Sequence, residues 1–411
     1  MAFVQYATNI LTFLFCVLGA EAELPDHALI PAIRPNFTQL AEQVGLPCEE
    51  VQVTTEDGYI LDMFHIPGNK SHPVLLQSGN FGSSDDYMIR GNTSLPYVLW
   101  EAGYDVWVGN VRGCRYGRRH VSFDPDLDDE FWDFSFHEFA VYDTSAMIDY
   151  ILNRTEAKTL SSIGWSYGTA VNYILGAEKP EYNDLIDCII SLAPIAYLHH
   201  SIPFEALIPV APLGFDAVIL TDKNEIMGEN STEIALLRDS CSTPIVAHET
   251  CLKAMDVTFG FNPEQIEVEF APKIFQHYPS STSRKNLMHE FQTLTTKRFA
   301  QFDYGPEENK IIYGSEEPKE YDLSKNKINI FLISGKNDQA SKLGDVALLK
   351  PKLPNVVEHI ILKPEKFCHL DFVCGKDTHK NLYKPIILPI LKKYNNNIKQ
   401  KTKKSKSKKL N

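Results

Sequence analysis

A serine between two glycines is the feature of this sequence that most directly predicts chemistry. Ser166 is the centre of GWSYG (164–168), which matches G-x-S-x-G, the pattern of a nucleophile on a sharp strand-to-helix turn. Such a turn leaves no space for side chains two residues before and after the serine, so glycine occupies both positions. The stretch 160–163 predicts the strand before the turn, and 169–178 predicts the helix after it. This context favours Ser166 as the nucleophile of an acyl transfer.

An acid and a base follow the serine in the chain order that this type of site uses. Asp338 comes after a predicted strand at 328–333, and His369 comes after one at 356–362. Residues just past the carboxyl ends of parallel strands gather at one edge of the sheet, where Ser166 also lies. We therefore predict that His369 takes the proton of Ser166 and that Asp338 orients the imidazole ring.

Acyl transfer also needs backbone amides that stabilise the negative charge on the tetrahedral intermediate. The residue after the nucleophile, Tyr167, supplies one candidate amide. The loop LLQSGNFGSS (75–84) follows a predicted strand, and the amide of Asn80 within it is the second candidate. A plain glycine turn is the alternative interpretation of this loop, but its position relative to the serine motif favours an oxyanion hole.

The elements that would position these residues alternate as in a parallel α/β sheet. Short apolar runs separated by helical patterns extend from residue 50 to about 195, and Ser135 with Glu138 forms a capping box at the start of one helix. The alternation stops between about 197 and 325, then resumes and ends with a helix predicted at 380–394. We therefore predict an α/β fold with a mostly parallel sheet flanked by helices. The predicted strands are 73–77, 104–108, 160–163, 185–192, 328–333 and 356–362.

The block between the two parts of the sheet predicts an inserted, mainly helical cap. Its most apolar stretch, 202–220, has two charged residues in 19, and its three prolines exclude one straight membrane-spanning helix. The stretch fits either a mobile lid over an apolar site or an ordinary cap helix buried on the sheet, since burial alone gives the same composition. If the protein meets a lipid–water interface, we expect 202–220 to make the contact.

Both ends of the chain are expected to lie outside the fold. Residues 1–22 contain a ten-residue apolar core and an A-x-A cleavage pattern, which predicts a secretory signal peptide; a buried N-terminal strand or helix is the alternative. The lysine-rich tail 395–411 predicts a disordered segment, either solvated without a task or in contact with anionic lipid or glycan. The predicted organisation is a signal peptide (1–22), a first core part (23–196), a cap (197–325), a second core part (326–394) and a tail (395–411).

Sequons and cysteines are compatible with the secretory route. Eight cysteines are present, and removal of Cys16 with the signal peptide would leave an odd number. Cys241 and Cys251 could close a short loop, whereas Cys368 and Cys374 could pair or stay free. Five N-x-S/T sequons are glycosylation candidates, at Asn36, Asn69, Asn92, Asn153 and Asn230.

The charge distribution argues against nucleic acid as a partner. The net charge is −13, but nine lysines lie within 391–411 and residues 1–22 contain one acid, Glu21, so residues 23–390 carry −21 and would repel phosphates. No apolar run approaches the roughly 18–20 residues of a spanning helix, and no Cys or His spacing predicts a zinc site. We therefore expect a globular protein without a transmembrane segment, a metal or a cofactor.

In several segments the chain resembles the acid lipases, the family of gastric and lysosomal lipases within the α/β-hydrolases. These segments cover nearly all of the chain after residue 22 and follow the family's order. They are TTEDGYILDMFHIP (54–67), AGYDVWVGNVRG (102–113), FWDFSFHEFAVYD (131–143), GWSYG (164–168), SLAPIAYL (191–198) and CHLDFVCGKD (368–377). The resemblance implies an α/β-hydrolase with a helical cap and lid that cleaves triacylglycerols or sterol esters without a metal, in an extracellular or lysosomal setting.

The resemblance also assigns roles to individual residues. It implies Ser166, Asp338 and His369 as the catalytic triad, the backbone amides of Asn80 and Tyr167 as the oxyanion hole, and Cys241 with Cys251 as a disulfide in the cap. The chain departs from the family where Trp165 and Tyr167 flank the serine in place of His and Gln. It departs again where Ser78-Gly79-Asn80 stands for the usual His-Gly-Leu.

Three functions are therefore to be distinguished. The first is a serine esterase or lipase that acts on neutral lipid esters, which the complete set of serine, acid and base favours. A short-chain carboxylesterase is the alternative within the same enzyme class. The departures around Ser166 motivate the third, a catalytically silent lipid-binding protein on the same fold.

Overall fold

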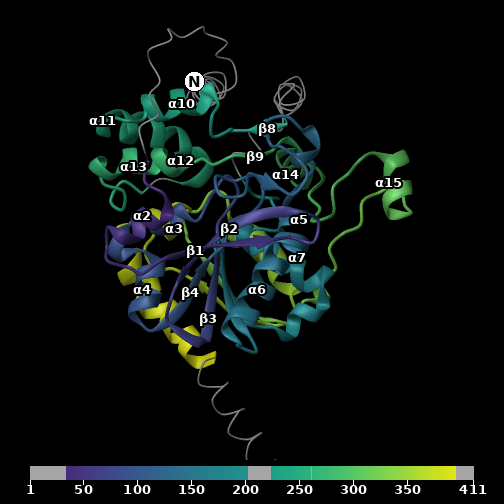
Figure 1. The fold of residues 1–411 in the computed structure, drawn as a ribbon, viewed down its shortest axis with the longest axis horizontal. Helices are drawn as coiled ribbons and strands as arrows, with labels where there is room; N and C mark the ends of the chain where they lie inside the picture. Colours follow the sequence, from purple (N-terminus) through teal and green to yellow (C-terminus); the bar gives the residue numbers. More distant parts are fainter. Residues whose placement is uncertain (1–33, 202–223, 261, 395–411) are drawn as a thin grey trace, which may run out of the picture.

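The fold is built on a nine-stranded, mostly parallel sheet, seen in a computed structural model that describes residues 34–201, 224–260 and 262–394 (Figure 1). In the strand order given at the end of this paragraph, the second strand pairs antiparallel with both the first and the third strand. The remaining neighbours pair parallel. The short strand β5 (Arg119–His120) pairs with the second strand outside this order. The order is β1 (Glu49–Thr54), β2 (Tyr59–Ile66), β4 (Tyr104–Val108), β3 (Asn69–Gln77), β6 (Leu160–Trp165), β7 (Ile186–Leu192), β10 (Asn329–Ser334) and β11 (Val356–Ile361).

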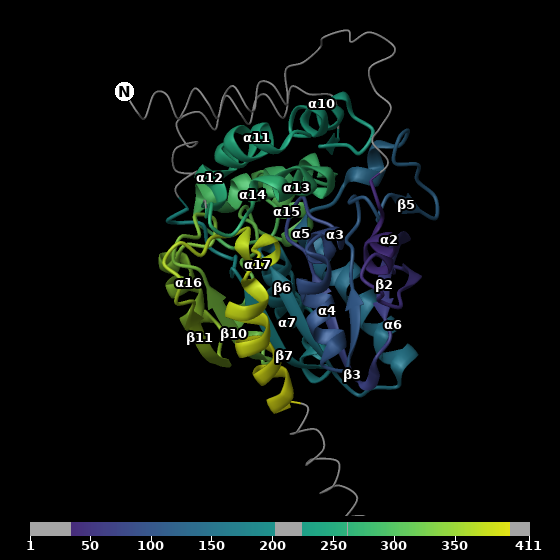
Figure 2. The ribbon, with the colours of Figure 1, turned by 90° about the vertical axis from the view of Figure 1, so that its left-hand side faces the viewer.

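Helices cover both faces of the sheet, which gives three layers (Figure 2). Successive side chains of a strand point to opposite faces, so Val74 and Leu76 belong to one apolar cluster and Leu75 to the other. The first cluster includes residues of α4 (Leu95–Glu101) and of the final helix, and the second includes residues of α6 (Ser145–Thr155) and α7 (Tyr167–Glu178). The predicted α/β fold is confirmed. Further helices of the two layers are α2 (Phe37–Glu42), α3 (Asp85–Met88), α16 (Leu343–Leu349) and α17 (Asp371–Cys374).

Most strands lie where the sequence predicts them, and the helices differ in detail. The capping box is present, because the Ser135 amide donates to Glu138 over 2.7 Å. The helix that it starts is not uniform, since α5 (Phe136–Glu138) continues through a π-helical stretch, η3 (Phe139–Thr144), into α6. The helix predicted at 380–394 begins with a π-helical stretch, η9 (His379–Ile387), and continues to residue 394. The antiparallel strands β1 and β2 were not predicted.

A helical layer between β7 and β10 lies over the carboxyl ends of the strands (Figure 2). The disulfide between Cys241 and Cys251, which the resemblance implies, joins the end of one of these helices to η5 (Ala247–Leu252). The boundaries predicted for the cap, 197–325, stay a prediction. The layer contains α10 (Thr232–Ser240), α11 (Pro244–Val246), α12 (Lys253–Phe259), α13 (Ala271–His277) and α14 (Arg284–Thr296), with the strand pair β8 (Glu225–Ile226) and β9 (Thr282–Ser283).

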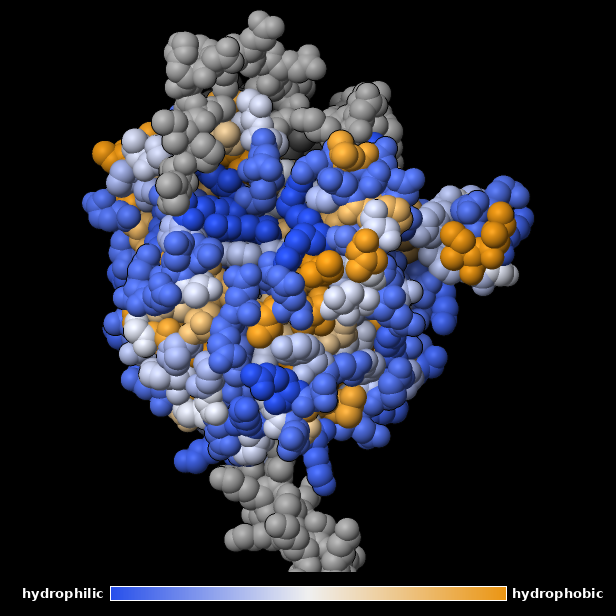
Figure 3. Space-filling view, in the orientation of Figure 1, coloured by the Kyte–Doolittle hydropathy of each residue, from blue (hydrophilic) through white to orange (hydrophobic). Residues whose placement is uncertain are grey.

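A separate helix, α15 (Pro306–Tyr313), projects from the body of the molecule (Figure 1). An apolar patch marks it on an otherwise largely hydrophilic face (Figure 3), where Ile311 and Ile312 are exposed. Among the described helices, none has the length and apolarity that crossing a membrane requires. The predicted signal peptide (1–22), lid stretch (202–220) and tail (395–411) lie outside the described residues.

The five predicted glycosylation sites all lie on described residues. Asn36 is half-buried, because its side chain caps the start of α2 and accepts from the Gln39 amide. The other four asparagines, Asn69, Asn92, Asn153 and Asn230, are exposed. Their exposure leaves these four side chains accessible to a glycosylating enzyme, and their modification stays a prediction.

Candidate active site

Ser166 lies on a strained turn between β6 and α7, the strand–turn–helix context that its motif predicts. Its backbone has φ 56° and ψ −126°, a conformation that persists only when the surroundings enforce it. A Cβ atom on Gly164 would lie 2.4 Å from the carbonyl oxygen of Gly168, and one on Gly168 would lie 2.5 Å from that of Gln77. Both glycines are therefore required by close backbone contact.

A continuous chain of hydrogen bonds joins Ser166 to the predicted acid and base. Nε2 of His369 lies 2.8 Å from Oγ of Ser166, and Nδ1 lies 2.9 Å from Oδ2 of Asp338. All three side chains are buried, with Ser166 8% exposed. Because Nδ1 faces a carboxylate, the proton resides there and Nε2 is left to accept from the serine hydroxyl. The structure thus brings together three residues that are far apart in the sequence.

The loop after β10 fixes the carboxylate of Asp338. Oδ1 accepts from the backbone amides of Ala340 over 3.0 Å and Ser341 over 2.7 Å. The hydroxyl of Ser341 in turn donates to the carbonyl oxygen of Pro194, just past β7. Oδ1 also lies 3.0 Å from Nδ1 of His369, so both carboxylate oxygens face the imidazole ring.

His369 is held by aromatic residues from two different parts of the chain. Its ring stacks on Phe259 at the end of α12, with 5.3 Å between ring centroids, and lies 5.4 Å from the ring of Trp165. Its amide donates to the carbonyl oxygen of Phe259 over 2.9 Å, and Trp165 Nε1 donates to its carbonyl oxygen over 3.2 Å. The tryptophan that departs from the family pattern therefore helps to hold His369. Nothing in the sequence near Phe259 signalled its part in the site.

Asp371 stabilises the loop that carries His369, and the surroundings of its carboxyl group favour the protonated, neutral state. Oδ2 accepts both from the Cys368 amide over 2.9 Å and from Asn262 Nδ2 over 2.8 Å, whereas Oδ1 has no partner among the described residues. Burial raises the pKa of this carboxyl to about 7. Cys368 and Cys374 in the same loop are both free thiols, which settles the alternative that the sequence left open.

The Asp371→Asn variant should change how stability depends on pH. The folded protein keeps the Asp371 proton up to about pH 7, whereas the unfolded chain releases it near pH 4, so this group lowers stability as pH rises between these values. Asparagine mimics the neutral carboxyl, so the variant should gain at most about 4 kcal/mol over the wild type at about pH 8 and almost nothing at about pH 4. Chemical denaturation at both pH values measures the difference.

The matched control for this change is the exposed Asp184→Asn. It should leave the stability difference from the wild type the same at both pH values. An Asp371→Asn effect that is equally independent of pH would contradict a neutral carboxyl at this position.

The loop after β3 passes directly beside Ser166. A Cβ atom on Gly79 would lie 2.8 Å from Cβ and 3.3 Å from Oγ of Ser166, so the loop can approach this closely only with glycine there. Asn80 follows in the chain, and Tyr167 is the first residue of α7, where a helix leaves amides without an internal partner. Both candidate oxyanion amides therefore neighbour Ser166, and their role stays a prediction. Among the residues that the structure describes, no group of three or more His, Cys, Asp or Glu side chains could hold a metal ion.

Comparisons with known proteins agree with this arrangement. Two family models match the chain, a partial alpha/beta-hydrolase lipase region at residues 37–91 and the alpha/beta hydrolase fold at residues 72–217. Gastric triacylglycerol lipase of Homo sapiens is 32% identical over 371 residues, which cover 88% of this chain and 92% of that protein. Lysosomal acid lipase/cholesteryl ester hydrolase of Homo sapiens is 32% identical over 381 residues, which cover 89% and 93%. The chain belongs to the gastric and lysosomal acid lipase family.

Membership confirms the resemblance seen in the sequence and the class of reaction. A third relative, Lipase 3 of Drosophila melanogaster, is 34% identical over 356 residues, which cover 84% of this chain and 90% of that protein. The crystal structure of a candidate lipase from Acinetobacter baumannii has the same fold, with a TM-score of 0.50 at 13% identity, over 90% of this chain and 100% of that one. This acid lipase family member is a carboxylic ester hydrolase on an α/β-hydrolase fold. Its relatives include lipases named gastric and lysosomal, in agreement with the predicted secretory route.

Proposed function

We propose that the protein hydrolyses carboxylic esters of neutral lipids, with Ser166 as nucleophile, His369 as general base and Asp338 as the group that orients the base. The observation that carries this proposal is the unbroken hydrogen-bonded chain of three buried side chains, at 2.8 Å and 2.9 Å from the histidine. A hydroxyl that donates to a neutral imidazole is ready to lose its proton when it attacks a carbonyl carbon.

The reaction proceeds through an acyl-enzyme. Oγ of Ser166 attacks the ester carbonyl carbon while Nε2 of His369 takes the hydroxyl proton, and the carbonyl oxygen becomes an oxyanion that the amides of Asn80 and Tyr167 stabilise. The tetrahedral intermediate collapses when the alcohol leaves with the proton from His369. Water then gives a proton to His369 and attacks the acyl-enzyme, and the second tetrahedral intermediate collapses when His369 returns that proton to Oγ of Ser166, which releases the fatty acid. Asp338 stabilises the imidazolium in both halves of the reaction.

The choice of a lipid ester rests on the relatives and on the helical layer over the site. Relatives are named triacylglycerol lipase and cholesteryl ester hydrolase, so a triacylglycerol or a sterol ester is the proposed substrate. We assign residues 23–196 and 326–394 to the hydrolase core and 197–325 to the cap, and we assign contact with the lipid–water interface to the cap. A short-chain carboxylesterase and a silent lipid-binding protein are the other outcomes of the test.

Turnover of three ester types tests the proposal. The purified protein should hydrolyse an emulsified long-chain triacylglycerol or sterol ester faster than a soluble short-chain ester, because the proposed substrate is a neutral lipid. A fluorophosphonate probe should label the same preparation, because it reacts with an activated serine. Faster hydrolysis of the soluble ester would indicate a carboxylesterase. Lipid binding without turnover or labelling would indicate a silent protein.

A further inference from the structure

The oxyanion loop, residues 78–85, is bonded to the segment 277–290 of the helical layer at Asn80, Phe81 and Asp85. A cavity of about 20 Å³ lies between them, lined by residues of both, including Gly79, Asn80, Ser281 and Asn286. Such a cavity has room for about one water molecule, and the hydrogen bonds of Asn286 and Ser280 to the loop show direct contact between the two segments. The conformation of the loop can therefore depend on this segment.

The side chain of Asn80 is held from two sides by one face of α14. Nδ2 of Asn286 donates to Oδ1 of Asn80 over 2.9 Å, and Nδ2 of Asn80 donates to Oε1 of Glu290. Asn286 and Glu290 are four residues apart and so lie on the same side of the helix. The carboxamide thereby uses both its oxygen and its nitrogen, which fixes its orientation.

A buried carboxyl group such as that of Glu290 lowers the stability of the fold unless a hydrogen bond satisfies it. The residue is only 6% exposed, and burial raises the pKa of its carboxyl well above the usual range. Nδ2 of Asn80 is the donor that satisfies its carboxyl oxygen. A buried carboxyl with one donor from the oxyanion loop links the helix to that loop, because loss of the bond would leave a buried polar group without a partner.

The next residue of the loop is in a strained conformation that the same segment supports. Phe81 has φ 53°, which is unfavourable for a residue with a side chain and is retained only under constraint. The amide of Ser280 donates to the carbonyl oxygen of Phe81 over 2.7 Å. The segment thus stabilises the backbone directly after Asn80, whose amide is the candidate oxyanion donor.

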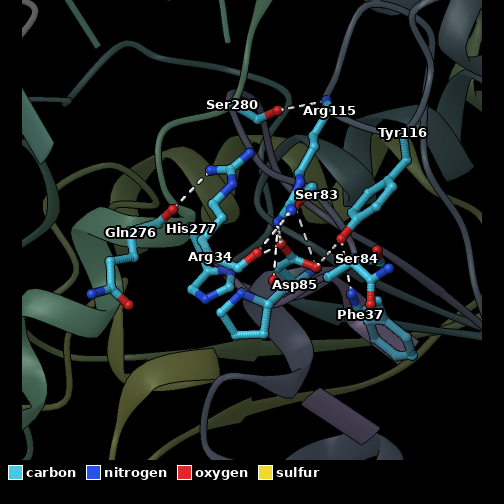
Figure 4. Close-up of polar contacts among 12 residues, drawn as sticks. Arg34, Phe37, Ser83, Ser84, Asp85, Arg115, Tyr116, Gln276, His277 and Ser280 are labelled. Carbon is cyan, nitrogen blue, oxygen red and sulfur yellow. Dashed lines mark hydrogen bonds and ion pairs between the residues drawn. The ribbon is translucent and has the colours of Figure 1, made fainter. Parts of the chain in front are cut away.

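The far end of the loop is fixed to both the helical layer and the core (Figure 4). Buried Asp85 lies 2.8 Å from Nδ1 of His277, which comes from α13, and it accepts from Arg115 and from the hydroxyl of Tyr116, each over 2.7 Å. The Arg115 amide also donates to Oγ of Ser280 over 2.8 Å. With this end fixed, Asn80 is the part of the loop whose position depends on α14, and Phe81 is held by Ser280.

We propose that Glu290 is a positioning residue for ester hydrolysis: through the carboxamide of Asn80 it holds the oxyanion loop so that the Asn80 amide faces the oxygen of the tetrahedral intermediate. The proposal rests on the function proposed above. Glu290 acts through Asn80 and takes no part in proton transfer. Because the oxyanion forms only during the reaction, loss of this hold should lower kcat and leave KM nearly unchanged.

Two substitutions at Glu290 separate this role from a general structural one. Glu290→Gln keeps an oxygen that accepts from Asn80, so it should retain kcat within about threefold. Glu290→Leu removes the acceptor, so kcat for a soluble ester should fall about tenfold to a hundredfold, less than the loss from deleting a whole oxyanion donor. Thr293→Val on the same helix is the matched control, since its buried hydroxyl bonds only to the carbonyl oxygen of His289. The control should leave kcat and KM unchanged.

Hydrogen–deuterium exchange of the free protein tests the hold without any turnover. Glu290→Leu should speed exchange in residues 78–85. Exchange in residues 160–168, which contain β6 and the turn at Ser166, should stay as slow as in the wild type. If Glu290→Leu fails to fold, Asn80→Ala replaces it, because that change removes the carboxamide and keeps the backbone amide.

Each outcome bears on a different claim. Unchanged exchange in 78–85 would overturn the hold, and faster exchange with unchanged kcat would overturn its part in catalysis. A kcat for Glu290→Gln as low as that for Glu290→Leu would overturn the assigned hydrogen bond. The function itself fails separately, through wild-type turnover in a Ser166→Ala variant.

Discussion

Replacing Ser166 with alanine is expected to lower ester turnover by at least about four orders of magnitude. The change removes the hydroxyl that lies 2.8 Å from Nε2 of His369. Without it no proton can pass to His369 and no acyl-enzyme can form. The fold should survive, because alanine keeps the Cβ atom that packs on Gly79 and adds no volume. Initial rates on a soluble ester, together with fluorophosphonate labelling and thermal unfolding, measure the three effects.

A second serine of the same strand gives the matched control. Ser161 is buried in β6, and within the described part of the chain its hydroxyl is joined only to the weak donor Sγ of Cys188, so Ser161→Ala should keep both turnover and labelling. Labelling of Ser166→Ala at the wild-type level would show that another residue reacts with the probe. The assignment of Ser166 would then be wrong.

Replacing Asp338 with asparagine is expected to lower kcat by about three to four orders of magnitude while the protein stays folded. The amide oxygen can still accept from the backbone of Ala340 and Ser341, which places the NH₂ group at Oδ2, the oxygen position nearer to Nδ1 of His369 (2.9 Å against 3.0 Å), where it donates to Nδ1. The imidazole proton then moves to Nε2, which can no longer accept from the serine hydroxyl. Steady-state kinetics and thermal unfolding of the variant measure both claims.

The exposed Asp129→Asn is a suitable comparison for this variant and should match the wild type in both measurements. An Asp338→Asn enzyme that stays within tenfold of the wild-type kcat would mean that the tautomer is set by another group. A large loss of thermal stability would instead assign Asp338 mainly to the structure of its loop.

The parallel part of the fold could be predicted from the sequence because its strands are buried on both faces. Runs such as 104–108 and 186–192 are mostly apolar, and the structure buries nearly all of their residues. The edge strand β1, EEVQVT, is mostly exposed and polar, and β2 mixes polar with apolar residues, so neither gave a buried-strand signal. Their pairing depends on tertiary contact rather than on local pattern.

The residues of the site also differ in whether the sequence alone could predict them. Ser166, Asp338 and His369 could be predicted because each follows a strand, and topology brings the ends of parallel strands together. Phe259 and Glu290 could not, because they reach the site from helices whose place in space no periodicity reports. The state of Cys368 and Cys374 was equally open, since spacing does not decide whether two thiols pair.

The stacking of Phe259 on His369 bears on how this enzyme can be engineered. Exchanging the helical segment between β7 and β10 for that of a relative is an obvious route to a new substrate range. In this chain, however, the exchange would also replace the ring beneath the base and the carbonyl oxygen that accepts from its amide. A chimera should therefore keep residues 259–290 from the same parent as Asn80 and His369, and draw its diversity from the remainder of the insertion. The segment between β7 and β10 therefore takes a direct part in placing His369 in this molecule.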